Sequence, residues 1–207
     1  MKFTLPLMAL VLLLLLSGCA TPWMTNTKRN AIEQYLISSV VERGISSASF
    51  KDYRNKKVAM DYTYFDPQTD KQYTQGVLEL RLAELGMIVV KKAEEADYII
   101  QPLCGVLATD HSKIFLGTPS LPVPVPNANL DIVSPEVPLF QKFTRNGYGK
   151  FSFGVYEAKG RKPHAVLPTT RSSARYIDWV ILLIPFKTHD MEMDDTVQAE
   201  IQYDFIP

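Results

Sequence analysis

Cys19 is the residue whose type and setting point most clearly to chemistry, because it follows an apolar run and two small residues. The run extends from Leu5 to Leu16, Lys2 precedes it, and polar chain follows the cysteine. A bilayer-spanning helix needs about 20 apolar residues, and this run has only about a dozen. The pattern favours a secretory signal that ends at a thiol, with a short N-terminal membrane anchor as the alternative.

The four residues Leu16-Ser17-Gly18-Cys19 resemble the lipobox of bacterial lipoproteins. The resemblance implies cleavage between Gly18 and Cys19, diacylglycerol on the Cys19 sulfur and an acyl chain on the new amino group. An ordinary signal is cut after an Ala-x-Ala-like site, and no such site precedes Cys19. One acyl chain holds a protein reversibly, whereas several hold it firmly. By the same resemblance, Ala20 in place of Asp implies the outer membrane, on its periplasmic face.

Elsewhere in the chain, the residue types that support catalysis or metal binding are scattered. The three histidines, His111, His164 and His189, lack the spacings of a zinc site. The chain has no Gly-x-Ser-x-Gly elbow and no phosphate-binding glycine loop. The adjacent acids at 94–95 and 194–195 point apart on a strand or turn, so they are expected to be solvated. We therefore predict no catalytic residues, no metal and no cofactor beyond the covalent lipid.

A dispersed active site is the weaker alternative. Its candidate residues are His164, Asp110, Arg171 and Arg175. A serine nucleophile needs a general base, and the two arginines beside the serine pair at 172–173 do not supply one. A periplasmic hydrolase that acts on peptidoglycan or lipid is therefore a minor hypothesis.

Cys104 has no disulfide partner within the chain if Cys19 carries lipid. It lies in the apolar run YIIQPLCGVL, and a free buried cysteine behaves as a small apolar residue. A reactive thiol needs a basic neighbour or a helix N-terminus. We predict that Cys104 fills space in the core.

The composition indicates a globular domain that does not bind nucleic acid. Of the 207 residues, 46% are apolar and 21% are charged, as in soluble domains. Removal of residues 1–18 leaves 189 residues with 21 basic and 22 acidic side chains. This near-neutral balance offers no electrostatic basis for nucleic-acid binding. We predict a signal over 1–18, a lipidated tether over 19–26 and one globular α/β domain over 27–207.

The elements that must position these residues begin with helices and short strands. Apolar periodicity predicts helices over 26–45 and 74–86. Strands are predicted over 56–65, 87–91 and 98–110. The order helix, strand, helix, strand, strand predicts an α+β fold, with two amphipathic helices on one side of a mixed sheet.

Residues 111–138 form the most unusual segment, because they contain six prolines and several large apolar residues. Proline favours extended backbone without donors, so a long proline-rich loop is predicted. A loop of about 25 residues is uncommon unless it has a function or is disordered. The apolar content argues against disorder and predicts a loop held against the protein itself, a partner or a bilayer. The candidate partner-binding residues are Phe115, Leu116, Leu121, Val123 and Val125.

The C-terminal half is predicted to be rich in strands. Residues 138–167 alternate apolar and polar side chains and contain glycines at the breaks in this alternation. Residues 179–186, WVILLIPF, are continuously apolar but too few to span a bilayer. The run is therefore predicted to be a central strand.

Several stretches resemble a family of uncharacterised bacterial lipoproteins, a domain of unknown function. They are TNTKRNAIEQYLISSVVERGI, KVAMDYTYFD, EEADYII, ATDHSKIFLGTP, SPEVPLFQKFTRNGYGKFSFGVYEAKGRK and WVILLIPF. This resemblance implies location and a shared fold, and it brings no activity. The order of the front elements is also similar to the α/β domain of curli-secretion-type assembly lipoproteins.

The function predicted from these features is that of a membrane-anchored periplasmic lipoprotein without catalysis, which binds or scaffolds an envelope partner. The predicted partners are the lipid bilayer, through Cys19, and an envelope protein. An oligomeric secretion or assembly component is the main alternative, and the sequence leaves the oligomeric state open.

Overall fold

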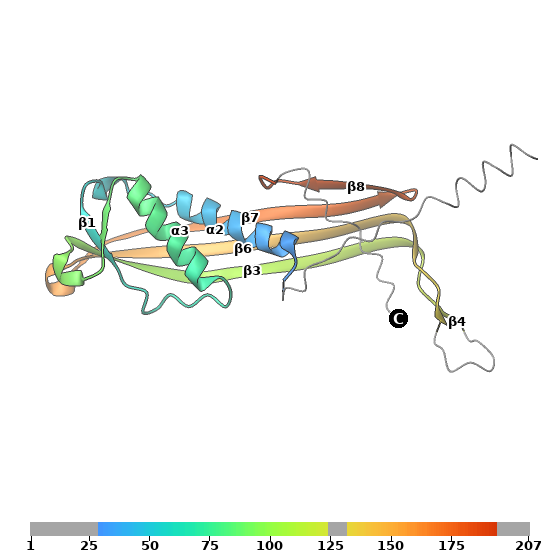
Figure 1. Ribbon diagram of the computed structural model, residues 1–207, viewed down its shortest axis with the longest axis horizontal. Coiled ribbons are helices and arrows are strands. Elements are labelled where there is room, and N and C mark those ends of the chain that lie inside the picture. Colours follow the sequence, from blue (N-terminus) through green and yellow to red (C-terminus); the bar gives the residue numbers. More distant parts are fainter. Residues whose placement is uncertain (1–28, 124–131, 194–207) are drawn as a thin grey trace, which may run out of the picture.

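The computed structural model describes residues 29–123 and 132–193 of the chain. The predicted signal, the cleavage site at Gly18 and Cys19, and the tether lie outside the described residues, as does Val125. Figure 1 shows a long sheet with the two helices over one of its halves. The elements are α2 (Ala31–Ser46), β1 (Lys57–Met60), α3 (Lys71–Glu84), β2 (Ile88–Val90), β3 (Tyr98–Thr118), β4 (Pro122–Val123), β5 (Ile132–Val133), β6 (Val137–Glu157), β7 (Pro163–Ile181) and β8 (Ile184–His189), with single 3-10 turns at Lys51–Tyr53, Ala93–Glu95 and Lys159–Arg161.

The main sheet is mixed and has the strand order β2-β1-β3-β6-β7-β8. Strand β1 runs parallel to β2 and β3, whereas β3, β6, β7 and β8 pair antiparallel. Both helices contribute to one core cluster with the sheet, so they cover the same face. The predicted α+β fold, with two helices on one side of a mixed sheet, is confirmed.

The core lies between the helices and the middle of the sheet. Its fully buried side chains include Leu36 and Val40 from α2, Leu78 and Leu82 from α3, and Ile100, Phe151, Phe153 and Val155 from the sheet. Asn30 caps α2, because its side-chain oxygen accepts a hydrogen bond of 2.8 Å from the Glu33 N–H. The cap at Asn30 fixes where α2 begins, and the apolar stripe fixes which side of α2 packs against the sheet.

Two glycines let α2 lie directly against β6. A Cβ on Gly149 would come within 2.5 Å of Val40 Cγ1, and one on Gly44 within 2.7 Å of the Phe151 ring. The first helix was predicted over 26–45, whereas α2 begins at Ala31 and continues past Gly44 to Ser46. Gly44 is there for close packing and does not end the helix.

The predicted loop over 111–138 starts too early. Strand β3 continues to Thr118, and residues 111–118 pair with 137–145 of β6. The strand persists because β6 supplies a partner along its whole length, and the prolines begin only at Pro119. Beyond it, β4 and β5 pair as a short two-stranded sheet.

The predicted central strand over 179–186 is wrong. Strand β7 ends at Ile181, β8 begins at Ile184, and Leu182 and Leu183 form the turn between them. Strand β8 is the last strand of the sheet. The continuous apolar run is thus a hairpin, and its apolar character does not reflect burial on both faces.

Candidate functional site

Part of the sheet extends beyond α2, and we call it the distal arm: residues 109–118, 137–147 and 174–189. The remainder, which α2 and α3 cover, is called the helix-covered half. Leu36, in the first half of α2, lies against Gly147, at the inner limit of the arm. Figure 1 shows the arm continuing from there to the β7–β8 turn, away from both helices.

Strand register sorts the side chains of the arm into rows on the face opposite the helices. Gly147 and Gly149 point toward α2, so the even-numbered residues of β6 face away from it. The outermost row that crosses all four strands is Leu116, Phe140, Ile181 and Ile184, and the next is Ile114, Lys142, Trp179 and Phe186. Beyond the outermost row, β3 and β6 still pair through Gly117–Thr118 and Val137–Pro138. The third row is Ser112, Thr144, Ile177 and Thr188. Apolar character therefore decreases from the end of the arm inward.

The end of the arm is apolar and exposed. Leu182 is 70% exposed, Ile184 67% and Leu116 65%. Leu182 and Ile184 belong to the β7–β8 hairpin and Leu116 belongs to β3, so two separate parts of the sequence meet here. We call the outermost row together with Leu182 and Leu183 the apolar end.

The turn at the apolar end has an unusual backbone for its residues. Leu182 and Leu183 have φ angles of 49° and 68°, in the left-handed region. Side chains with a Cβ pay roughly 1–2 kcal/mol per residue in this region, so Asn-Gly is the usual choice for such turns. Two leucines stand here in spite of that cost.

Aromatic rings and a lysine lie directly behind the apolar end. Trp179 stacks on Phe186 with ring centroids 5.9 Å apart, and Phe140 meets it edge-on at 6.2 Å. The Lys142 amine lies 4.8 Å from the centre of a Trp179 ring. The indole N–H of Trp179 donates to the Thr188 hydroxyl at 3.0 Å, which fixes the ring against β8. The rings of Phe140, Trp179 and Phe186 thus form one aromatic layer, and the Lys142 amine lies on it.

The face of the arm on the helix side carries a buried ion pair. Arg145 and Asp178 are 3.1 Å apart, and the Asp178 side chain is almost fully buried. Burial raises the pKa of Asp178, while Arg145 and Lys187 oppose that shift. The Arg145 guanidinium also lies over the Phe143 ring, at 4.6 Å. On this face the charge pair therefore lies among apolar and aromatic neighbours, Phe143, Tyr176 and Val180.

The predicted binding residues lie partly at this end. Phe115 and Leu116 lie near the C-terminal end of β3, and Leu121 lies three residues beyond that strand. Leu121 is 54% exposed. Val123 is in β4, and Val125 is outside the described residues.

Sequence reasoning missed Trp179, Leu182 and Leu183 as members of the same surface. The signal that could have found them is the symmetry of WVILLIPF about its central Leu-Leu pair. Residues 181 and 184, and then 179 and 186, become cross-strand neighbours. A palindrome of apolar types is typical of a hairpin whose centre is a turn.

The dispersed catalytic candidates do not converge. His164 and Arg175 are eleven residues apart on β7, or about 35 Å at the rise of an extended strand. Asp110 and Arg175 flank Asn146 in one row, and Arg175 Nε donates to the Asn146 side-chain oxygen at 3.2 Å. His164 instead packs against the ring of Tyr98, with centroids 4.9 Å apart. Arg171 lies opposite Lys150.

Cys104 is half-buried and packs against the core, as its apolar surroundings predict. Burial raises the pKa of its thiol to about 11, so the thiol is protonated at neutral pH. Among residues 29–123 and 132–193, no three metal-ligating side chains cluster. Within the same residues, no helix has the length and apolar character needed to cross a bilayer.

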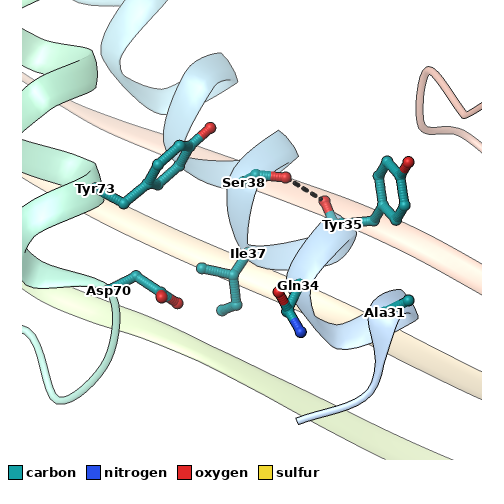
Figure 2. A pocket seen from close by; sticks show the side chains of 7 residues that line it. All are labelled: Ala31, Gln34, Tyr35, Ile37, Ser38, Asp70 and Tyr73. Carbon is teal, nitrogen blue, oxygen red and sulfur yellow. Dashed lines mark hydrogen bonds between the residues drawn. The ribbon is translucent and has the colours of Figure 1, made fainter. Parts of the chain in front are cut away.

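A shallow hollow lies between α2 and the start of α3, and its volume is about 390 Å³. Figure 2 shows Ile37 of α2 on the side of Asp70, with Gln34 next to it, while the Ser38 hydroxyl turns the other way and donates to the Tyr35 carbonyl. Arg29 binds Asp70 with two hydrogen bonds of 2.5 and 2.7 Å. The hollow is thus bordered by an ion pair that holds the beginning of α2 against the beginning of α3.

Comparison with known proteins gives a family without an activity. A family model described as a family of unknown function, DUF6655, matches residues 13–200. The chain belongs to this family. A search of curated proteins finds no match. Membership of the DUF6655 family therefore brings no known activity to this chain.

Proposed function

We propose that this DUF6655 protein is a lipid-anchored envelope protein that binds a partner polypeptide and performs no catalysis. Cys19 would carry diacylglycerol and an N-terminal acyl chain, and would hold the protein on the periplasmic face of the outer membrane. The Leu16-Ser17-Gly18-Cys19 stretch supports the anchor through its resemblance to a lipobox. The open edge of β3 supports the binding role.

The open edge of β3 is the observation that carries this proposal. One side of β3 pairs with β6 along the whole strand, but the other side pairs with β1 only at residues 98–100. From Gln101 to Thr118, no other described strand pairs with that side. An edge of this kind is a template on which an extended segment can add a strand.

Side chains beside the edge favour a peptide with apolar residues at alternate positions. Leu103 and Val106 are 43% and 42% exposed. They flank an irregularity in register at Gly105, and Pro102 precedes them without a donor. The bulge and the proline limit pairing near the helix-covered half, so the long stretch from Val106 outward is the preferred region.

Two measurements test the proposal. Intact-mass analysis of the processed protein should show a lipidated Cys19 and no leader, and an unmodified thiol would remove the anchor from the proposal. For the edge, native protein is compared with Leu103→Lys/Val106→Lys in crosslinked pulldowns, because lysine discourages strand addition. Val166→Lys, on β7 at 83% exposure, is the matched control. Identical partners in all three samples would contradict the binding role of the edge.

An oligomeric assembly component is the second candidate, because the same edge could pair with another copy. Sedimentation of the lipidated protein in detergent separates the two. An oligomer that the lysine pair dissociates would replace the partner polypeptide with a second copy. A monomer would remove this candidate.

A further inference from the structure

We propose that the apolar end is a membrane-contact site that enters the lipid bilayer beside the anchor. This inference rests on the lipid anchor of the proposed function. It assigns a second attachment to the membrane, formed by the folded arm and separate from Cys19. The occupant is lipid, and four features of the arm argue for it.

The first feature is the order of the rows along the arm. The outermost row is entirely apolar, the second contains Trp179 and Lys142, and the third is rich in hydroxyls. Tryptophan and lysine are typical of the boundary between lipid and water, where an amphipathic ring and a long cationic side chain are both satisfied. A bilayer imposes this order along one axis, from acyl chains through headgroups to water.

The second feature is the depth. Successive rows are two residues apart, or about 7 Å at the rise of a strand. Interfacial segments bury their apolar part about 5–10 Å into the headgroup and acyl boundary. With Leu182 and Leu183 inserted first, the outermost row reaches the acyl boundary and Trp179 lies at the headgroups.

The third feature is charge. Lys142 lies on the Trp179 ring, on the face of the apolar rows, whereas Lys187 lies on the helix side of β8, opposite Asp178. The nearest acid on the arm, Asp178, is buried and paired with Arg145. The positive charge of Lys142, which is partly exposed on the face of the apolar rows, therefore matches anionic lipid headgroups.

The fourth feature is the reach of the anchor. Along α2, Leu36, Val40 and Gly44 lie against Gly147, Gly149 and Phe151 in turn, so the helix starts at the side of the arm. Five residues of helix bring Ala31 about 7 Å further along, and Phe140 is about 24 Å from Gly147 on β6. About 17 Å thus separates the start of α2 from the outermost row. The twelve residue steps from Cys19 to Ala31 can span up to about 40 Å.

The test measures how deep Trp179 lies in a membrane. The processed protein is reconstituted in phosphatidylethanolamine and phosphatidylglycerol vesicles whose acyl chains carry bromine, a contact quencher of indole emission. Trp23 is replaced by Phe, because Trp23 and Trp179 are the two tryptophans of the chain. We expect bromine near the headgroup end of the acyl chain to quench Trp179 more than bromine near the chain terminus.

The deciding variant is Leu182→Asn/Leu183→Gly. Asn-Gly suits the left-handed turn better than two leucines, so the hairpin is retained while its apolar side chains are removed. We expect this variant to lose the quenching of Trp179 and to remain as stable as the parent in urea unfolding. Leu80→Gln, at a position of α3 that is 67% exposed, should keep the quenching.

The readouts separate this inference from the anchor. Lipid on Cys19 with an unquenched Trp179 would overturn the membrane contact and leave the anchor standing. If added vesicles quench Trp179 in a protein without lipid on Cys19, the membrane contact stands and the anchor is overturned. If the leucine pair variant instead changes the sedimentation mass in detergent while Trp179 stays unquenched, the apolar end joins two copies and the proposal is wrong.

Discussion

The two halves of the sheet are built from the same strands, yet they treat apolar side chains in opposite ways. Phe151 and Phe153 of β6 are each 1% exposed on the face under the helices, whereas Leu116, on the opposite face in the distal arm, is 65% exposed. Large apolar residues are present in both halves. The comparison teaches that alternation predicts a strand, while a covering layer from elsewhere in the sequence decides whether its apolar side is buried.

The largest expected effect comes from the helix-covered half. Phe153→Ala should lower the free energy of unfolding by about 3–5 kcal/mol, because it leaves a cavity beside Phe50, whose ring lies 5.2 Å away. Urea unfolding followed by circular dichroism measures the change. The matched substitution in the arm is Phe186→Ala, at 42% exposure, and it should cost less than about 1 kcal/mol. Equal losses would contradict the division of the sheet into a covered half and an open arm.

Close packing of α2 on β6 gives the next largest effect. Gly149→Ala should destabilise the protein by about 1–3 kcal/mol, because the new methyl group meets Val40 at 2.5 Å. The control is Gly76→Ala in α3, where a Cβ meets nothing within 4 Å. This control should stabilise the helix by about 0.5–1 kcal/mol. If α2 packs this tightly on β6, the midpoint of thermal unfolding should fall for Gly149→Ala and rise for Gly76→Ala.

Much of the fold could be predicted from the sequence because it depends on local patterns. Apolar periodicity predicted helices over 26–45 and 74–86, and they overlap α2 at Ala31–Ser46 and α3 at Lys71–Glu84. The end of β3 could not be located in this way, because residues 111–118 are a strand only through pairing with β6.

The candidate surface was harder to predict than the fold. Phe115 and Leu116 were identified from an apolar, proline-rich segment, but the register that places Trp179 and the Leu182–Leu183 turn beside them is a long-range property. An apolar run without glycine or asparagine lacks the residues that usually mark a tight turn, because two leucines in the left-handed region violate the local preference. Local rules fail at this position, where the proposed membrane contact lies.

The buried Asp178 of the arm gives a smaller effect that depends on pH. Burial raises its pKa above the ordinary 3.8, so the folded state holds the proton more tightly than the unfolded state. Its contribution to stability is therefore full below pH 3.8 and is lost as the pH rises through the folded pKa, with a slope of at most about 1.4 kcal/mol per pH unit. Asp178→Asn should flatten that part of the stability curve in urea unfolding.

Asp61 of the helix-covered half is the control of opposite sign. A hydrogen bond from the Thr63 hydroxyl, opposed by burial and assisted by Arg161, lowers the pKa of Asp61. Its stabilisation is present above pH 3.8 and is lost as the pH falls through the folded pKa. The differences between parent and variant should therefore slope in opposite directions for Asp178→Asn and Asp61→Asn. If both differences in the free energy of unfolding change with pH in the same direction, burial does not raise the pKa of Asp178.

The smallest expected effect is at the outermost row of the arm. Leu116→Ser should change the free energy of unfolding by no more than about 0.5 kcal/mol, because a side chain exposed in both states loses little on truncation. Leu36→Ser, the same exchange at a fully buried site of α2, should be destabilising by several kcal/mol, since it adds a buried hydroxyl to a cavity. If Leu116→Ser is neutral for the protein in solution but destabilising on anionic vesicles, Leu116 is held by lipid. If Leu116→Ser is strongly destabilising in solution, other parts of the chain cover the row, and the arm is an extension of the core.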